Sequence, residues 1–181
     1  MPYLEPLLAF PNIKTFNLWS SSVIPSIHDD DLAQFGAAWP RLTSFHVSHL
    51  VSRQDIVSSG AVPPTLSGLV DFARRCPHLE SFRTPALDAK VFPDKTATLP
   101  LGHRLQSISI TDSVTLPSPT SRAFSEVARI LDCVFPSVVL EDARAKAIKN
   151  MKGWDKLTEL VKTMRLHREA RALGVRIREI D

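Results

Sequence analysis

The sequence predicts an α/β fold in which irregular repeats stack into a solenoid, with a parallel β-sheet on the concave side and helices outside. An apolar helical run, a proline and a short strand-like run recur in that order along the chain. Each strand-like run has the spacing apolar-x-x-apolar-x-apolar, which places its last apolar residues on one face. The 181 residues are 44% hydrophobic and 23% charged, which suits one domain with a sizeable core.

About five units follow one another. Equivalent positions at the end of each helical run are taken by four prolines and one histidine: Pro11, Pro40, Pro77, His103 and Pro136. The steps between them are 29, 37, 26 and 33 residues, and each step has room for one helix, one strand and two loops. A single unit cannot bury its own apolar face, so neighbouring units have to stack. We expect repeats over residues 1–150 and a C-terminal capping helix with its tail over 151–181. The alternative is an ordinary α/β domain without repeats.

The limits of the helices follow from capping residues and prolines. Short polar residues that cap helix N-termini precede three helical runs: Asp29, Asp30 or Asp31, then Thr65 or Ser67, then Thr120 or Ser121. The residue before a proline is pushed out of helical geometry. Each helix is therefore expected to end immediately before its proline.

Polar residues alternate with the apolar positions of the strands and point away from the core. They are Thr15, Asn17, Ser44, His46, Ser81, Arg83, Ser107 and Ser109. We expect them to form a partner-binding surface with Arg83 and His46 as anchors and Trp19 at its rim, because arginine is favoured at interface hot spots. The alternative is that they form only the solvated side of the sheet.

Several blocks resemble the leucine-rich-repeat region of fungal F-box proteins, especially the basidiomycete group. They are WPRLTSF at 39–45, CPHLESF at 76–82, PPTLSGL at 63–69, ITDS at 110–113 and FP at 135–136, and the resemblance extends over residues 7–175. It implies an adaptor role: an F-box docks on a Skp1-type adaptor of a cullin ubiquitin ligase while the repeats select an unknown target protein. No F-box precedes the first unit here, so a Skp1-type partner is expected only if an F-box lies upstream.

The two ends of the chain differ. An end repeat needs a polar cap, and the opening residues offer apolar side chains instead: Leu4, Leu7, Leu8 and Phe10. We expect this edge to be exposed, so that the chain is part of a longer product or associates with itself there. The other end carries an apolar helical stripe, which predicts a capping helix: Trp154, Leu157, Leu160, Val161 and Met164.

The sequence contains no recognisable catalytic motif. It has no glycine-rich phosphate loop, nucleophile elbow or HExxH pair, so we expect a non-enzymatic protein without cofactor or metal. His46 and His49 are expected to be ordinary surface or loop groups. Cys76 and Cys133 are expected to be buried thiols, which together with the lack of a signal peptide favours the cytoplasm or nucleus.

Charge is distributed unevenly. Residues 1–143 carry 11 Lys/Arg against 14 Asp/Glu, and residues 144–181 carry 11 against 5. Basic residues before the last helix share one helical face: Arg144, Lys146, Lys149 and Lys152. An alternative function is therefore a free-standing α/β domain that uses this segment for an acidic partner or nucleic acid. Nucleic acid is less favoured, because Trp154 is the one aromatic residue after Phe135. No membrane association is expected, since no run approaches about 20 apolar residues.

Overall fold

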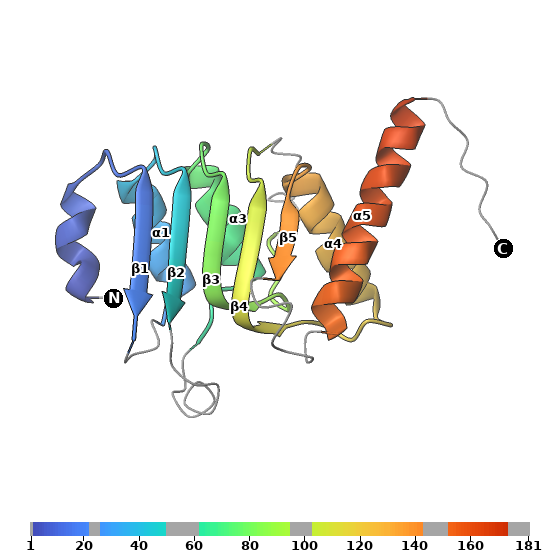
Figure 1. Ribbon diagram of the computed structural model, residues 1–181, viewed down its shortest axis with the longest axis horizontal. Helices are drawn as coiled ribbons and strands as arrows, with labels where there is room; N and C mark the ends of the chain where they lie inside the picture. Colours follow the sequence, from blue (N-terminus) through green and yellow to red (C-terminus); the bar gives the residue numbers. More distant parts are fainter. Residues whose placement is uncertain (1, 22–25, 50–61, 95–102, 143–151, 174–181) are drawn as a thin grey trace.

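The computed structural model describes residues 2–21, 26–49, 62–94, 103–142 and 152–173. It contains one parallel sheet whose strands follow chain order: β1 (Thr15–Ser20), β2 (Ser44–His49), β3 (Ser81–Asp88), β4 (Ser107–Thr115) and β5 (Val139–Asp142). One face of the sheet is covered by three helices: α1 (Asp29–Ala38), α3 (Leu66–Arg75) and α4 (Arg122–Val134) (Figure 1). The predicted α/β class with a parallel sheet is confirmed.

Two helices lie at the ends of the sheet. The 3-10 helix η1 (Pro2–Ala9) lies beyond β1, and α5 (Lys152–Ala172) lies beyond β5, where it packs on α4 (Figure 1). The predicted stripe of α5 is confirmed, because Trp154, Leu157 and Val161 are buried and Leu160 and Met164 are partly buried. None of the described helices combines the length and apolar character that crossing a membrane requires.

Three helices end in the same local geometry. Trp39, Cys76 and Phe135 each close a helix and directly precede a proline. Their φ angles are −123°, −114° and −124° and their ψ angles 61°, 73° and 70°. Each still donates its N–H to the carbonyl four residues earlier, at 2.8, 3.0 and 3.0 Å. The prediction that each of these helices ends before its proline is confirmed.

Neighbouring strands begin with the same backbone hydrogen bond. The N–H of Thr43 donates to the carbonyl of Lys14, that of Glu80 to Thr43, and that of Gln106 to Glu80, each at 2.8 Å. Val139 donates likewise to Gln106 at 2.7 Å. The strands therefore start in register, and equivalent positions of the sequence pattern lie side by side.

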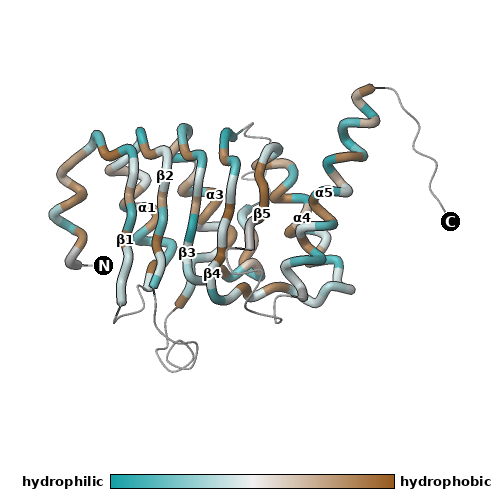
Figure 2. The backbone as a smooth tube through the Cα atoms, in the orientation of Figure 1, coloured by the Kyte–Doolittle hydropathy of each residue, from teal (hydrophilic) through white to brown (hydrophobic). Residues whose placement is uncertain are grey.

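The core lies between the sheet and the helices. Phe16, Phe45 and Phe82 form a row across three strands, with ring centroids 5.3 and 5.6 Å apart, and the register continues the row to Ile108 and Leu140. Such stacked pairs contribute about 1 kcal/mol each beyond the area they bury. Figure 2 shows the apolar segments of α3 and α4 behind the sheet, where this core lies.

The N-terminal residues do not form the bare edge that the sequence suggested. Leu4 is only 6% exposed and belongs to the core, while Leu7 and Leu8 are half-buried against it. The indole N–H of Trp39 donates to the carbonyl of Leu7 at 3.2 Å. Phe10 alone of the four predicted residues is exposed. The expectation of solvent-facing leucines was wrong because η1 lays them over the end of the core, which removes the reason for self-association there.

The helix caps follow the sequence at two of three sites. Thr65 accepts the N–H of Gly68 at 3.0 Å, and Ser121 accepts the N–H of Phe124 at 3.2 Å. The cap of α1, however, is His28, whose N–H donates to Asp31 Oδ2 at 2.9 Å. None of the three predicted aspartates holds the cap position, because all three lie inside the first turn of the helix.

Candidate polar surface on the sheet

The eight residues proposed as partner-binding lie in two rows across four strands of the sheet. The first row is Thr15, Ser44, Ser81 and Ser107, and the second is Asn17, His46, Arg83 and Ser109. On β1, β2 and β3, one phenylalanine of the core row stands in the sequence between the two polar residues of the strand. Its side chain points to the opposite face of the sheet. These two rows, called the polar rows below, therefore occupy the face that α1, α3 and α4 do not cover (Figure 1).

Hydrogen bonds connect the polar rows across three strands. Nε2 of His46 lies 3.2 Å from Oγ of Ser44 and 2.7 Å from Oγ of Ser81. Oγ of Ser81 lies 3.0 Å from Oγ of Ser107. This chain of side chains fixes the imidazole of His46 and leaves the first row with ordered hydroxyl groups.

Exposure decreases along the polar rows from β1 to β4. Thr15 and Asn17 are exposed, and the residues of β2 and β3 are half-buried. Ser109 is only 2% exposed, so its assignment to a solvated surface was wrong. Its neighbour in register on β3 is Arg83.

Apolar residues extend this surface at both ends. Trp19 is 60% exposed and pairs in register with Ser48, one row beyond Asn17. Val139 is 55% exposed and continues the first row onto β5. The centre of this face is polar and its two sides carry exposed apolar residues. Most protein interfaces have the opposite arrangement, with an apolar centre and a polar rim.

A buried pair that the sequence did not reveal lies on the core side of the sheet. Nε2 of His49 is 2.9 Å from Oδ2 of Asp112, and both side chains are almost fully buried. Thr111 donates its hydroxyl to the same Oδ2 at 3.0 Å. His49 was predicted to be a surface or loop group, and this was wrong because it continues the inward alternation of Phe45.

The His49–Asp112 pair has a local structural cause. The register between β3 and β4 shifts between Thr84 and Ala86, so that β4 gains a residue where Asp112 lies. A bulge of this kind re-aims side chains. Nδ1 of His49 has no hydrogen-bond partner among the described residues, and no group of three or more potential metal ligands occurs among them.

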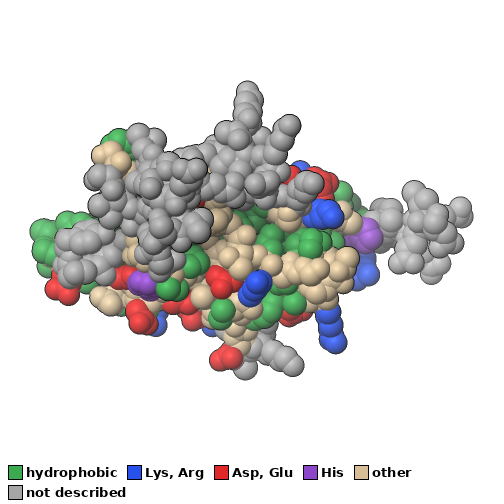
Figure 3. Space-filling model, turned by 90° about the horizontal axis from the view of Figure 1, so that it is seen from below, with side chains coloured by type: hydrophobic (Ala, Val, Ile, Leu, Met, Phe, Trp, Pro, Cys, Tyr) green, Lys and Arg blue, Asp and Glu red, His purple; other side chains and the backbone are tan. Residues whose placement is uncertain are grey.

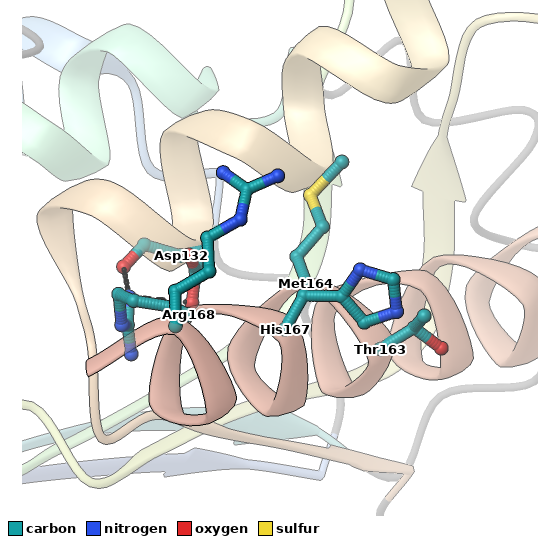
Figure 4. Close-up of a pocket in the computed structure, with 6 residues that line it drawn as sticks. Asp132, Thr163, Met164, His167 and Arg168 are labelled. Carbon is teal, nitrogen blue, oxygen red and sulfur yellow. Dashed lines mark hydrogen bonds and ion pairs between the residues drawn. The ribbon is translucent and has the colours of Figure 1, made fainter. Parts of the chain in front are cut away.

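A groove between α4 and α5 contains several basic groups (Figure 4). It has a volume of about 520 Å³ and is lined by Asp132, Thr163, Met164, His167, Arg168 and Arg171. Arg168 Nη1 lies 2.7 Å from Oδ1 of Asp132 and donates to that residue's carbonyl at 3.0 Å. Arg165 donates to the carbonyl of Val138 at 3.0 Å. Arg168 therefore satisfies a carbonyl in the last turn of α4 and Arg165 a carbonyl directly before β5, so both side chains are engaged within the chain.

The predicted basic face has only its last residue within a described element. Arg144, Lys146 and Lys149 lie outside the described residues, and Lys152 begins α5. Seen from the edge at which the strands end, acidic side chains gather towards β1 and basic side chains towards α5 (Figure 3). The charge asymmetry of the sequence thus also runs along the sheet.

The cysteines differ in their surroundings. Cys76 is fully buried, as expected, and burial raises the pKa of its thiol to about 12. Cys133, in α4, is only partly buried, so the expectation of a buried thiol was wrong for this residue.

Comparisons with known proteins add no assignment. No protein-family model matches the chain, and neither the curated proteins nor the solved structures compared with it yield a match. Function therefore has to be inferred from the surface itself.

Proposed function

We propose that this chain is a non-enzymatic protein-interaction module, built as an irregular leucine-rich-repeat solenoid and closed by α5 as a capping helix. Its partner binds on the polar rows. In this proposal it is the target-selecting region of an F-box-type ubiquitin ligase receptor.

The observation that carries the proposal is the alignment of the candidate residues in two adjacent rows on the face that α1, α3 and α4 leave free, where seven of them are at least partly exposed and Ser109 is buried. Strands are about 4.8 Å apart, so the rows from β1 to β4 extend over about 14 Å. A surface of this width accommodates part of a protein partner. Recurrent helix ends and strand junctions support the repeat architecture.

The binding surface is tested with two matched arginine substitutions. Asn17→Arg replaces a neutral amide by a long cation among the polar rows. Gln34→Arg also replaces a neutral amide by arginine, but at an exposed position of α1. We expect Asn17→Arg to weaken binding of a native partner at least tenfold in a calorimetric titration, and Gln34→Arg to leave the affinity unchanged. The reverse pattern would assign binding to the helix side.

The ligase role needs a separate experiment. The complete product of the transcript is expressed with a tag and mixed with purified Skp1-type adaptor. Adaptor binding that is lost when the region upstream of the repeats is removed would support the receptor role. Failure of the complete product to bind adaptor would reject that role and leave the interaction module.

A further inference from the structure

The connection between β3 and β4 differs from the other connections in the sheet. A helix stands between β1 and β2, between β2 and β3, and between β4 and β5, namely α1, α3 and α4. The described residues between β3 and β4, 89–94 and 103–106, contain no helix. In the helix layer α1 packs along α3, whereas α3 and α4 make no comparable contact. Among the described elements, this layer is therefore interrupted behind β4 (Figure 1).

A groove lies on α4 at this interruption. It has a volume of about 480 Å³ and is lined by residues 92–94, which follow β3, and by four residues of α4: Arg122, Ala123, Glu126 and Ile130. Ile130 and Asp132 are two positions apart in the helix, so they point to nearly opposite sides of α4. Because Asp132 contacts Arg168 of α5, the groove lies on the side of α4 that faces away from α5.

The lining combines apolar side chains with charges of both signs. Phe92 and Ala123 are partly exposed, and Pro93 and Ile130 are buried. Asp94 and Arg122 are exposed and carry opposite charges, so the groove does not select a ligand for a strong net charge. An apolar surface with mixed charges at its margin matches the apolar stripe of an amphipathic helix, which polar residues flank.

We propose that this groove binds the apolar face of an amphipathic helix from a partner protein. The bound helix lies beside α4 as α3 lies beside α1, and it fills the interruption in the helix layer. The groove volume is within the range of about 300–1,000 Å³ that is typical of ligand pockets. Helices dock in such grooves through residues at i, i+3, i+4 and i+7. This site is on the helix side of the sheet, so the inference goes beyond the proposed function of the polar rows.

The test uses the full-length ¹⁵N-labelled chain and two spin-labelled synthetic peptides of equal composition. In the first peptide, leucines recur at i, i+3, i+4 and i+7 among glutamates and lysines. In the second, the same residues are reordered so that the leucines share no face. A spin label broadens the signals of nearby backbone amides. We expect the amphipathic peptide to broaden those of Phe92 and the first half of α4 saturably, and the reordered peptide to leave them sharp.

Three results of this titration would overturn the proposal. They are no saturable broadening at α4, equal broadening by the two peptides, and broadening confined to the polar rows. A fourth result comes from the chain without peptide: if the same amide signals shift as its concentration rises, a second copy occupies the groove and the proposal fails.

Substitutions on the two walls of the groove assign the effect. Ala123→Arg places a long side chain in the groove, and Ala37→Arg makes the same change at an exposed position of α1. We expect Ala123→Arg to weaken binding of the amphipathic peptide at least tenfold and Ala37→Arg to leave it unchanged. Phe92→Ala removes the opposite wall without adding charge and should weaken binding as well, so the assignment does not depend on one variant. Native affinity in Ala123→Arg and Phe92→Ala would refute the site.

Discussion

At the scale of single residues, one buried polar side chain connects the end of α3 with the segment that leads into β4. His103 stands where the sequence pattern elsewhere has proline, and it is 7% exposed. Its Nε2 lies 2.9 Å from the carbonyl of Ala73 and 3.0 Å from that of Cys76, and its Nδ1 accepts the N–H of Leu105 at 3.0 Å. The imidazole therefore satisfies the end of α3 and the start of the next strand.

Replacing this imidazole by a ring of similar size removes its hydrogen bonds without opening a cavity. His103→Phe should lower the free energy of unfolding by about 2 kcal/mol, because the N–H of Leu105 loses its acceptor, while the carbonyls of Ala73 and Cys76 keep their backbone donors. Urea denaturation followed by circular dichroism measures this. The exposed neighbour provides the control: Arg104→Ala should change stability by less than about 0.5 kcal/mol. Equal stability of His103→Phe and the native chain would show that the N–H of Leu105 finds another acceptor.

The two thiols should differ in reactivity. Burial holds the Cys76 pKa at about 12, against an ordinary value of 9.0, so the thiolate that reacts is suppressed in the folded chain. The folded chain keeps the Cys76 thiol protonated. The contribution of this thiol to the free energy of unfolding is therefore complete below the unfolded-state pKa of 9.0 and is lost as the pH rises through 9 towards 12. At about pH 8, iodoacetamide should label the partly buried Cys133 while Cys76 reacts only after unfolding, as measured by mass spectrometry of peptides. Labelling of Cys76 as fast as in urea would contradict its burial.

At the scale of elements, the neighbouring helices α1 and α3 are joined by a specific contact as well as by the sheet. Asp29, in the first turn of α1, accepts the backbone N–H of Thr65 at 2.7 Å and its hydroxyl at 2.6 Å. Gly68 in α3 lies so close that an added Cβ would overlap the Asp29 carboxylate. The start of α1 is thereby fixed to the cap of α3.

A methyl group at this contact should therefore be harmful even though alanine favours helices. Gly68→Ala is expected to cost about 2 kcal/mol of unfolding free energy, since overlap with Asp29 outweighs a gain of about 1 kcal/mol in helix propensity. The double variant is the control: in an Asp29→Ala background the same substitution should cost less or stabilise. A cost that stays the same in both backgrounds would place the strain elsewhere in α3.

The arginines of α5 should determine how firmly that helix is held. Arg168 donates to the carbonyls of Asp132 and Pro136 and pairs with the Asp132 carboxylate. Arg168→Gln should speed amide hydrogen exchange of α5 about tenfold, because a hydrogen bond to a charged group contributes about 1.5–3 kcal/mol. Lys162→Gln, at an exposed pair with Glu159, should leave exchange unchanged. Equal exchange in both variants would mean that the apolar stripe alone holds α5.

At the scale of the whole molecule, the parallel order of five strands places α1, α3 and α4 on one face of the sheet, and the described residues put no helix over the opposite face. Much of this was predictable, because apolar spacing and the prolines are local signals. They located β1 to β4, the helix ends and the two polar rows. Even β5, where the apolar pattern is weak, keeps its place in register.

The remaining features depend on residues far apart in the chain, which no local pattern records. The pairing of His49 with Asp112 requires the register shift at Thr84–Ala86. The burial of Leu4 requires η1 to pack over the end of the core. Ser109 and Arg83 alternate like solvated residues, so only the three-dimensional surroundings reveal that both lack partners.

The central claim, that the uncovered face is the one that binds, is tested most directly by photo-crosslinking in cells. A photoreactive amino acid is introduced at Ser44, in the middle of the first polar row, or at Gln34, on the exposed side of α1. We expect Ser44 to crosslink a partner protein, competed by excess native chain, and Gln34 to give no competed product. Crosslinks from Gln34 with none from Ser44 would contradict binding on the sheet.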